Sequence, residues 1–79
     1  MNPLTHTETI NFIHKIEEIR YSVIAIIREI IDQDSGDHIL QVEIIQIIDP
    51  TGQLIAPKTL LAVEFRQLVQ NAQSQYFNQ

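Results

Sequence analysis

The chain has 79 residues, enough for one small domain, and it contains no cysteine, so disulfides and thiolate zinc sites are excluded. Ten acidic residues against five dispersed basic ones give a net charge of −5, which argues against nucleic acid and anionic membranes as partners. The sequence has neither a leader pattern nor an apolar run of about 18 residues. We therefore expect one cytoplasmic domain over 1–79, with residues 1–5 and 77–79 loose.

The first predicted element is a long amphipathic helix over 7–33. Thr5 and Glu8 have the spacing of a capping box, and Gly36 lies where a glycine would close the helix. Between residues 12 and 33 one half of the helical projection is apolar except for Arg20. The apolar residues of this stripe are Phe12, Ile13, Ile16, Ile19, Val23, Ile24, Ile26, Ile27, Ile30 and Ile31. Because a 79-residue chain has little else to cover six helical turns, the stripe predicts self-association.

Residues 38–48 are rich in β-branched side chains and alternate between apolar and polar, which predicts a strand. The alternation places Leu40, Val42, Ile44 and Ile48 on one face. The Asp-Pro-Thr-Gly sequence at 49–52 is typical of a type I turn, so a short returning strand is expected at 53–56.

Pro57 suits the start of a second helix over 58–76. Its predicted apolar stripe consists of Leu61, Phe65, Leu68, Val69, Ala72 and Tyr76. The predicted fold is therefore an α+β arrangement of order α-β-β-α, with a long N-terminal amphipathic helix, a β-hairpin and a C-terminal helix, completed by oligomerisation.

A short sequence pattern that occurs twice, called the echo below, supports a second interpretation. Ile-Ile-Asp followed by a glycine-containing turn occurs both at 30–36 and at 47–52. If the echo is structural, residues 21–32 form a strand that pairs with 38–48 through the Asp-Ser-Gly loop. The alternative fold is then an α-β-β-β-α antiparallel meander.

Two groups of residues have the spacing of metal ligands. Residues 32–43 resemble an EF-hand calcium loop, with Asp32 and Asp34 at positions 1 and 3 and Glu43 at position 12. The glycine stands at position 5 instead of 6, and no exiting helix is expected, so we interpret the segment as a polar connection with local backbone hydrogen bonds. On the predicted helix, the trio formed by His14, Glu17 and Glu18 is interpreted as a solvated surface. We expect no metal site.

No phosphate-binding loop and no nucleophile motif is present, so we expect neither an enzyme nor a cofactor. The sequence predicts a non-catalytic, self-associating protein–protein interaction module, such as an adaptor, assembly factor or regulator, that forms a homodimer or higher oligomer and binds another protein. The predicted interface is Phe12, Ile16, Ile19, Arg20, Val23, Ile26 and Ile30. Alternative functions are an antitoxin- or inhibitor-type acidic protein that masks a basic partner, and a ligand- or metal-binding domain that uses loop 32–43.

Overall fold

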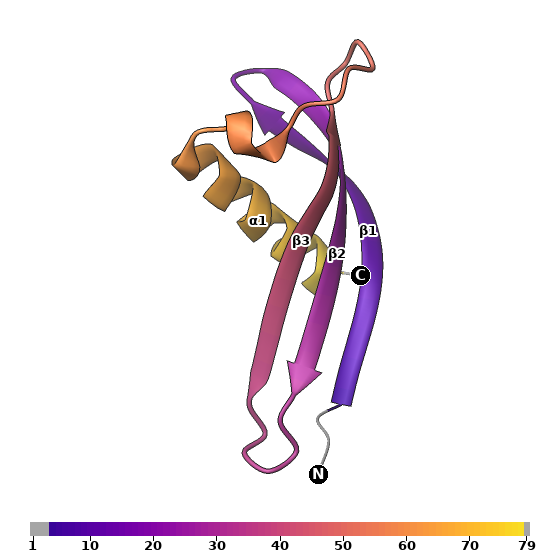
Figure 1. Ribbon diagram of the computed structural model, residues 1–79, viewed down its shortest axis with the longest axis vertical. Helices are drawn as coiled ribbons and strands as arrows, with labels where there is room; N and C mark the ends of the chain where they lie inside the picture. The colour runs from indigo at the N-terminus through magenta and orange to yellow at the C-terminus, as the bar shows by residue number, and fades with distance from the viewer. Residues whose placement is uncertain (1–3, 79) are drawn as a thin grey trace.

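A computed structural model of the chain describes residues 4–78 as a three-stranded antiparallel sheet with one helix packed on one face (Figure 1). The strands lie in the order β1-β2-β3. The elements are β1 (Leu4–Ile16), β2 (Ile19–Ile31), β3 (His38–Ile48), a short 3₁₀ helix η1 (Pro57–Thr59) and α1 (Ala62–Phe77).

The predicted N-terminal helix is wrong: residues 7–33 lie in β1, β2 and the start of the loop that follows them. Strand β2 pairs with β3 from Ser22–Ile48 to Ile31–His38, which matches the pairing in the alternative α-β-β-β-α fold. That alternative is wrong in its first element, because the described part of the chain begins with strand β1 and not with a helix. The physical reason is that neighbouring apolar residues point to opposite faces of a strand. In β2, Ile27 is fully buried while Ile26 lies on the other face.

Strands β1 and β2 are joined by a two-residue turn at Glu17 and Glu18. Both residues have positive φ, 49° and 70°, as in the type I′ turns that match the twist of a hairpin. Lys15 forms an exposed ion pair with Glu18 at 3.0 Å. The turn therefore places two glutamates in a backbone conformation that usually favours Asn or Gly.

The core lies between the sheet and α1. The sheet contributes alternate residues of its strands, and the helix contributes its two buried residues, Leu68 and Ala72. The buried apolar residues are Ile10, Phe12, Val23, Ala25, Ile27, Ile47, Leu68 and Ala72. Phe12 faces Val23 across β1 and β2, and Ile10 faces Ala25, so small and large side chains alternate beneath the helix.

A β-bulge interrupts the β2–β3 ladder. Ile24 faces Gln46 whereas Ala25 faces Ile44, so Ile45 is the extra residue. Beyond the bulge the buried side of β3 changes from even to odd positions. Ile47 is therefore in the core, at 2% exposure, and the expectation that Ile48 shares a face with Leu40, Val42 and Ile44 is wrong.

The segment after β3 matches the predicted turn but contains little strand. Gly52 N–H donates to the Asp49 carbonyl at 2.9 Å, and the returning segment makes one isolated bridge, Ile48 to Leu54. The C-terminal helix is present and begins later than predicted, at Ala62. The Leu61 backbone N–H donates to Glu64 Oε1 at 3.0 Å, which caps the helix start.

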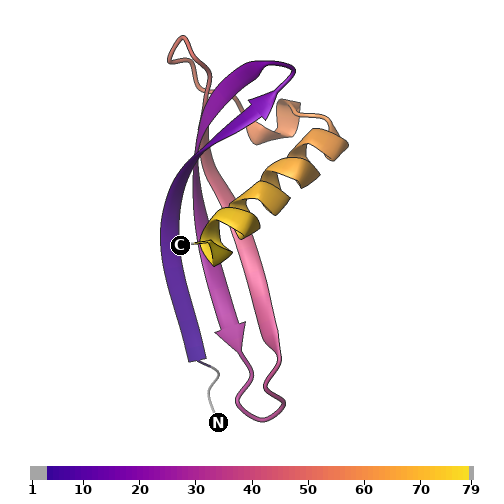
Figure 2. The same cartoon turned by 180° about the vertical axis from the view of Figure 1, so that it is seen from behind.

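The molecule is elongated, 47 × 21 × 21 Å, with a radius of gyration of 14.2 Å. A compact domain of this length has a radius of about 12 Å. Figures 1 and 2 show the cause: α1 crosses only the upper part of the sheet, and the lower ends of the strands project beyond it with the 32–37 loop. The face of the sheet opposite α1 has no layer on it in either view.

Candidate functional site

The face of the sheet opposite α1, here called the open face, is formed by the alternate residues that do not point to the helix. Strand pairing assigns to it, from β1, Thr5, Thr7, Thr9, Asn11, Ile13 and Lys15; from β2, Arg20, Ser22, Ile24, Ile26, Arg28 and Ile30; and from β3, Ile39, Gln41, Glu43, Gln46 and Ile48.

Six of the seventeen residues of the open face are isoleucines, and the other eleven are polar or charged. Ile13 and Ile39 are 56% and 54% exposed, and the bulge residue Ile45 is 48% exposed. Ile24, Ile26, Ile30 and Ile48 are half-buried. An antiparallel sheet with one solvated face normally carries polar residues there. Isoleucines on all three strands of one face are typical of a surface that binds another protein.

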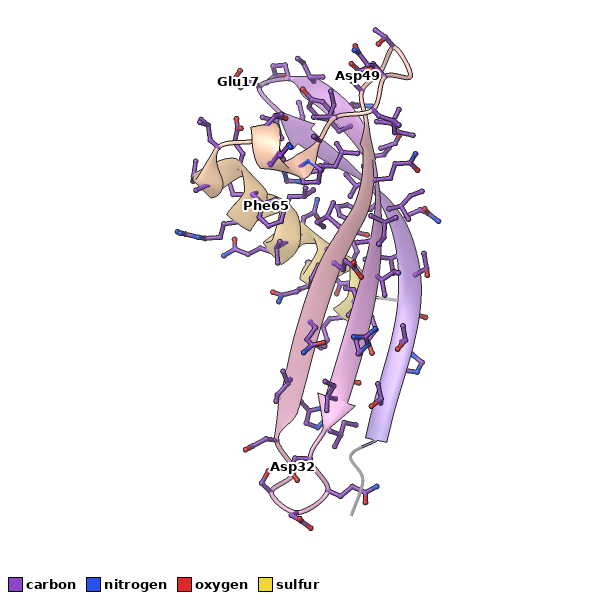
Figure 3. The ribbon with its side chains drawn as sticks, viewed as in Figure 1. Glu17, Asp32, Asp49 and Phe65 are labelled. Atoms are coloured by element: carbon purple, nitrogen blue, oxygen red, sulfur yellow. The ribbon has the colours of Figure 1, made fainter. Side chains whose placement is uncertain are left out.

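The charges of the open face also differ from those of the rest of the chain. Three of the five basic residues, Lys15, Arg20 and Arg28, lie on the open face, with Glu43 as its acidic residue. Most of the other carboxylates lie in the turns, in the 32–37 loop or on the helix side. Figure 3 shows Asp32 at the lower tip and Glu17 and Asp49 at the upper end.

A hollow of about 220 Å³ lies on the sheet and is lined by Ile26, Arg28, Gln41, Val42 and Glu43. The guanidinium Nη1 of Arg28 donates to Gln41 Oε1 at 3.4 Å across one side of it. Within residues 4–78 neither Arg28 nor Glu43 forms an ion pair with its own chain. The hollow is therefore lined by one cationic and one anionic group.

The predicted interface residues are divided between the two faces. Phe12 and Val23 are buried beneath α1, and Ile16 and Ile19 point to the same side at the turn end of the hairpin. Arg20, Ile26 and Ile30 lie together on the open face. The helical stripe thus mixed core residues with surface residues, and the exposed Ile13 and Ile39 were missing from the predicted set although an alternating pattern selects both.

The weak metal candidates do not form one site. Asp32 and Asp34 lie in the 32–37 loop, whereas Glu43 lies on β3 five residues beyond its first residue. Asp34 N–H donates to Asp32 Oδ1 at 3.0 Å and Asp37 N–H to Ser35 Oγ at 3.2 Å. The Asp34 N–H and the Ser35 hydroxyl lower the pKa of Asp32. Residues 4–78 contain no cluster of three metal-ligating side chains.

His14, expected on a solvated helix surface with Glu17 and Glu18, is instead a buried strand residue at 8% exposure. Asn71 Nδ2 lies 3.0 Å from His14 Nδ1, and His14 Nε2 has no partner in the described part of the chain. An amide that donates to Nδ1 leaves the proton on Nε2. Burial lowers the pKa of His14. This contact could not be predicted from sequence, because residues 14 and 71 belong to elements far apart in the chain.

A second polar cluster joins the C-terminal end of α1 to the sheet. Glu29 accepts from the Tyr76 hydroxyl at 3.3 Å, and its other oxygen lies 3.4 Å from His38 Nδ1. Partial desolvation, followed by the nearby Glu29 carboxylate, raises the pKa of Tyr76. The rings of His6 and Tyr76 are 6.4 Å apart. These residues come from all three strands and the helix, and they fix the end of α1 on the sheet.

Comparison with known proteins adds no further assignment: no protein-family profile, no curated protein and no solved structure matches this chain. Across residues 4–78 no helix has the length and apolar character needed to cross a membrane.

Proposed function

We propose that this protein is a non-catalytic, self-associating interaction module that binds through the open face of its sheet. The observation that carries the proposal is the set of isoleucines on all three strands of a face that no helix or strand within residues 4–78 covers. Burial of apolar area on this scale is the main favourable term in protein association.

The exposed area of the chain supports this proposal. A compact monomer of 9.1 kDa exposes about 4,900 Å², whereas this chain exposes 5607 Å². The excess is about 700 Å², close to the roughly 800 Å² that each partner buries in an interface of standard size. The open face can account for most of this excess.

The test compares two substitutions at equally exposed apolar residues. Ile39 on the open face and Val63 on the outer side of α1 are both 54% exposed. We expect Ile39→Asp to convert the assembly to monomers at tens of micromolar, and Val63→Asp to leave it intact, as measured by size-exclusion chromatography with light scattering. Circular dichroism checks that both variants keep the fold.

Two outcomes contradict the proposal. A wild-type chain that is monomeric at tens of micromolar rules out self-association. An assembly that Val63→Asp dissolves and Ile39→Asp leaves intact would place the interface on α1, where Phe65 and Phe77 are also exposed.

A further inference from the structure

We propose that two copies stack open face against open face about a two-fold axis, with the strands of one copy antiparallel to those of the other, an arrangement called head-to-tail below. In this arrangement Arg28 of each copy is paired with Glu43 of the other. This inference rests on the proposed function and specifies its partner, a second copy of the chain, and its register. The two-fold axis lies in the plane between the two sheets and crosses the strands at right angles. Along the strand direction it passes between the levels of Ile26 and Arg28, where the level of a residue means its row of paired neighbours across the sheet.

The first argument is the geometry of the central hollow. Glu43 faces Ile26 across β2 and β3, and Gln41 faces Arg28, so the acid and the base lie one level apart on neighbouring strands. An axis between these two levels brings Arg28 of one copy to the level of Glu43 in the other, twice. Because both groups line the hollow without an ion-pair partner among residues 4–78 of their own chain, the pairing satisfies both.

The second argument is the distribution of charge along the sheet. Lys15 and Arg20 face each other at one end of the open face. The acidic loop with Asp32, Asp34 and Asp37 lies at the opposite end (Figure 3). Lys15 already pairs with Glu18 of the turn at its own end of the sheet. A head-to-tail stack places Arg20 of each copy at the level of the acidic loop of the other. The same register places Ile24 over Ile30 of the second copy.

The head-to-head alternative brings like charges together. With the axis parallel to the strands, β2 lies over β2 at the same level, so Arg28 meets Arg28 and Arg20 meets Arg20. The acidic loops also meet. Like charges opposed across an interface disfavour association, so the charges of the open face select the head-to-tail orientation.

The available area fits a stable dimer. The two longer strands have 13 residues each and β3 has 11, which gives a face about 40 Å long at about 3.3 Å per residue. Three strands at about 4.8 Å spacing make it about 15 Å wide. The two faces together bury about 1,200 Å², at the lower end of the range for specific interfaces.

The test uses charge reversal in separate chains. Arg28→Glu gives a face with two carboxylates in the hollow, and Glu43→Arg gives one with two guanidinium groups. We expect each variant alone to dimerise at least about tenfold more weakly than the wild type. Mixing the two restores both cross-pairs, so we expect a heterodimer of wild-type affinity, identified by native mass spectrometry with one chain isotopically labelled.

Arg66→Glu mixed with Glu17→Arg is the matched control. These residues lie on α1 and in the β1–β2 turn, and the variants carry the same net charges as the test pair. We expect the control variants to self-associate like the wild type and to mix statistically. A heterodimer preference equal to that of the test pair would show general charge attraction and overturn the register.

The outcomes separate this inference from the proposed function. If the Arg28 and Glu43 variants remain dimeric alone, or fail to form a heterodimer when mixed, the head-to-tail register is wrong while self-association stands. If the wild type is monomeric, both fail.

Discussion

Ala25 and Ile26 are neighbours in β2 and point to opposite sides of the sheet: Ala25 is fully buried beneath α1 and Ile26 lies on the open face beside the hollow. Ala25 also faces Ile10 on β1 and Ile44 on β3, so its small side chain lies between two larger ones. Substitutions at Ala25 therefore test the stability of the fold, and substitutions at Ile26 test the proposed self-association.

Aspartate at these two positions is expected to have different effects. Ala25→Asp buries a carboxylate without a partner, which costs several kcal/mol, comparable to the whole stability of a small domain. We expect this variant to be unfolded by circular dichroism. Ile26→Asp should keep the fold and lose self-association in light scattering. Similar melting temperatures for the two variants would contradict this assignment of faces.

The buried His14 makes stability depend on pH. Burial lowers its pKa below the ordinary value of 6.5, so the unfolded chain binds this proton more readily than the folded one. Its effect on stability is absent well above pH 6.5. As the pH falls below that value, stability decreases by at most about 1.4 kcal/mol per pH unit, until the folded pKa is passed.

The measurement is urea unfolding of the wild type and His14→Phe between pH 8 and pH 5. Phenylalanine retains a buried ring and removes the titrating group. We expect the wild type to lose more stability than the variant on acidification. Parallel curves would show that His14 is not the cause.

The β1–β2 turn holds two glutamates at positive φ. The double substitution Glu17→Asn and Glu18→Gly introduces residues that accept this conformation, and we expect it to stabilise the fold by about 1 kcal/mol. Lys15→Gln measures the exposed Lys15–Glu18 pair separately and should change stability little. A destabilised double variant would contradict the turn geometry.

Asp49 organises the turn after β3. Its Oδ1 accepts from Thr51 N–H at 2.9 Å, from the Thr51 hydroxyl at 2.6 Å and from Gln53 N–H at 2.9 Å. These bonds, the hydroxyl first, lower its pKa below 3.8, so its contribution is present above that pH and is lost as the pH falls through the folded value. We expect the melting temperature at pH 7 to be highest for the wild type, lower for Asp49→Asn and lowest for Asp49→Ala. Equal values would show that the turn forms without this carboxylate.

Part of the fold was predictable from local sequence. The type I turn at 49–52, the strand at 38–48 and the C-terminal helix each follow from residues close in the chain. The first two strands were misinterpreted because β2 contains apolar doublets at 23–24, 26–27 and 30–31. Doublets three or four residues apart fill one side of a helix, and they also supply both faces of a strand.

The composition of residues 19–31 also favoured a strand, but the helical periodicity outweighed it. The segment 19–31 contains six isoleucines and a valine, residues that favour β-structure, but the turn before it has neither Asn nor Gly to mark a hairpin. Ile26 and Ile30 were predicted at an association surface, and they lie half-buried on the open face. The Arg28–Glu43 hollow was not predictable, because it depends on the β2–β3 register and on the bulge.

The extra residue in β3 sets a rule for redesigning this strand. Substitutions intended to make its open side polar must follow odd positions 39, 41 and 43, and then even positions 46 and 48. A pattern continued on odd numbers would put a polar group at residue 47, in the core. Deleting Ile45 would instead give a strand whose residues alternate between the two faces without interruption. All remaining residues of β3 would keep their partners on β2, so the extra twist of the bulge could be removed without repacking the core.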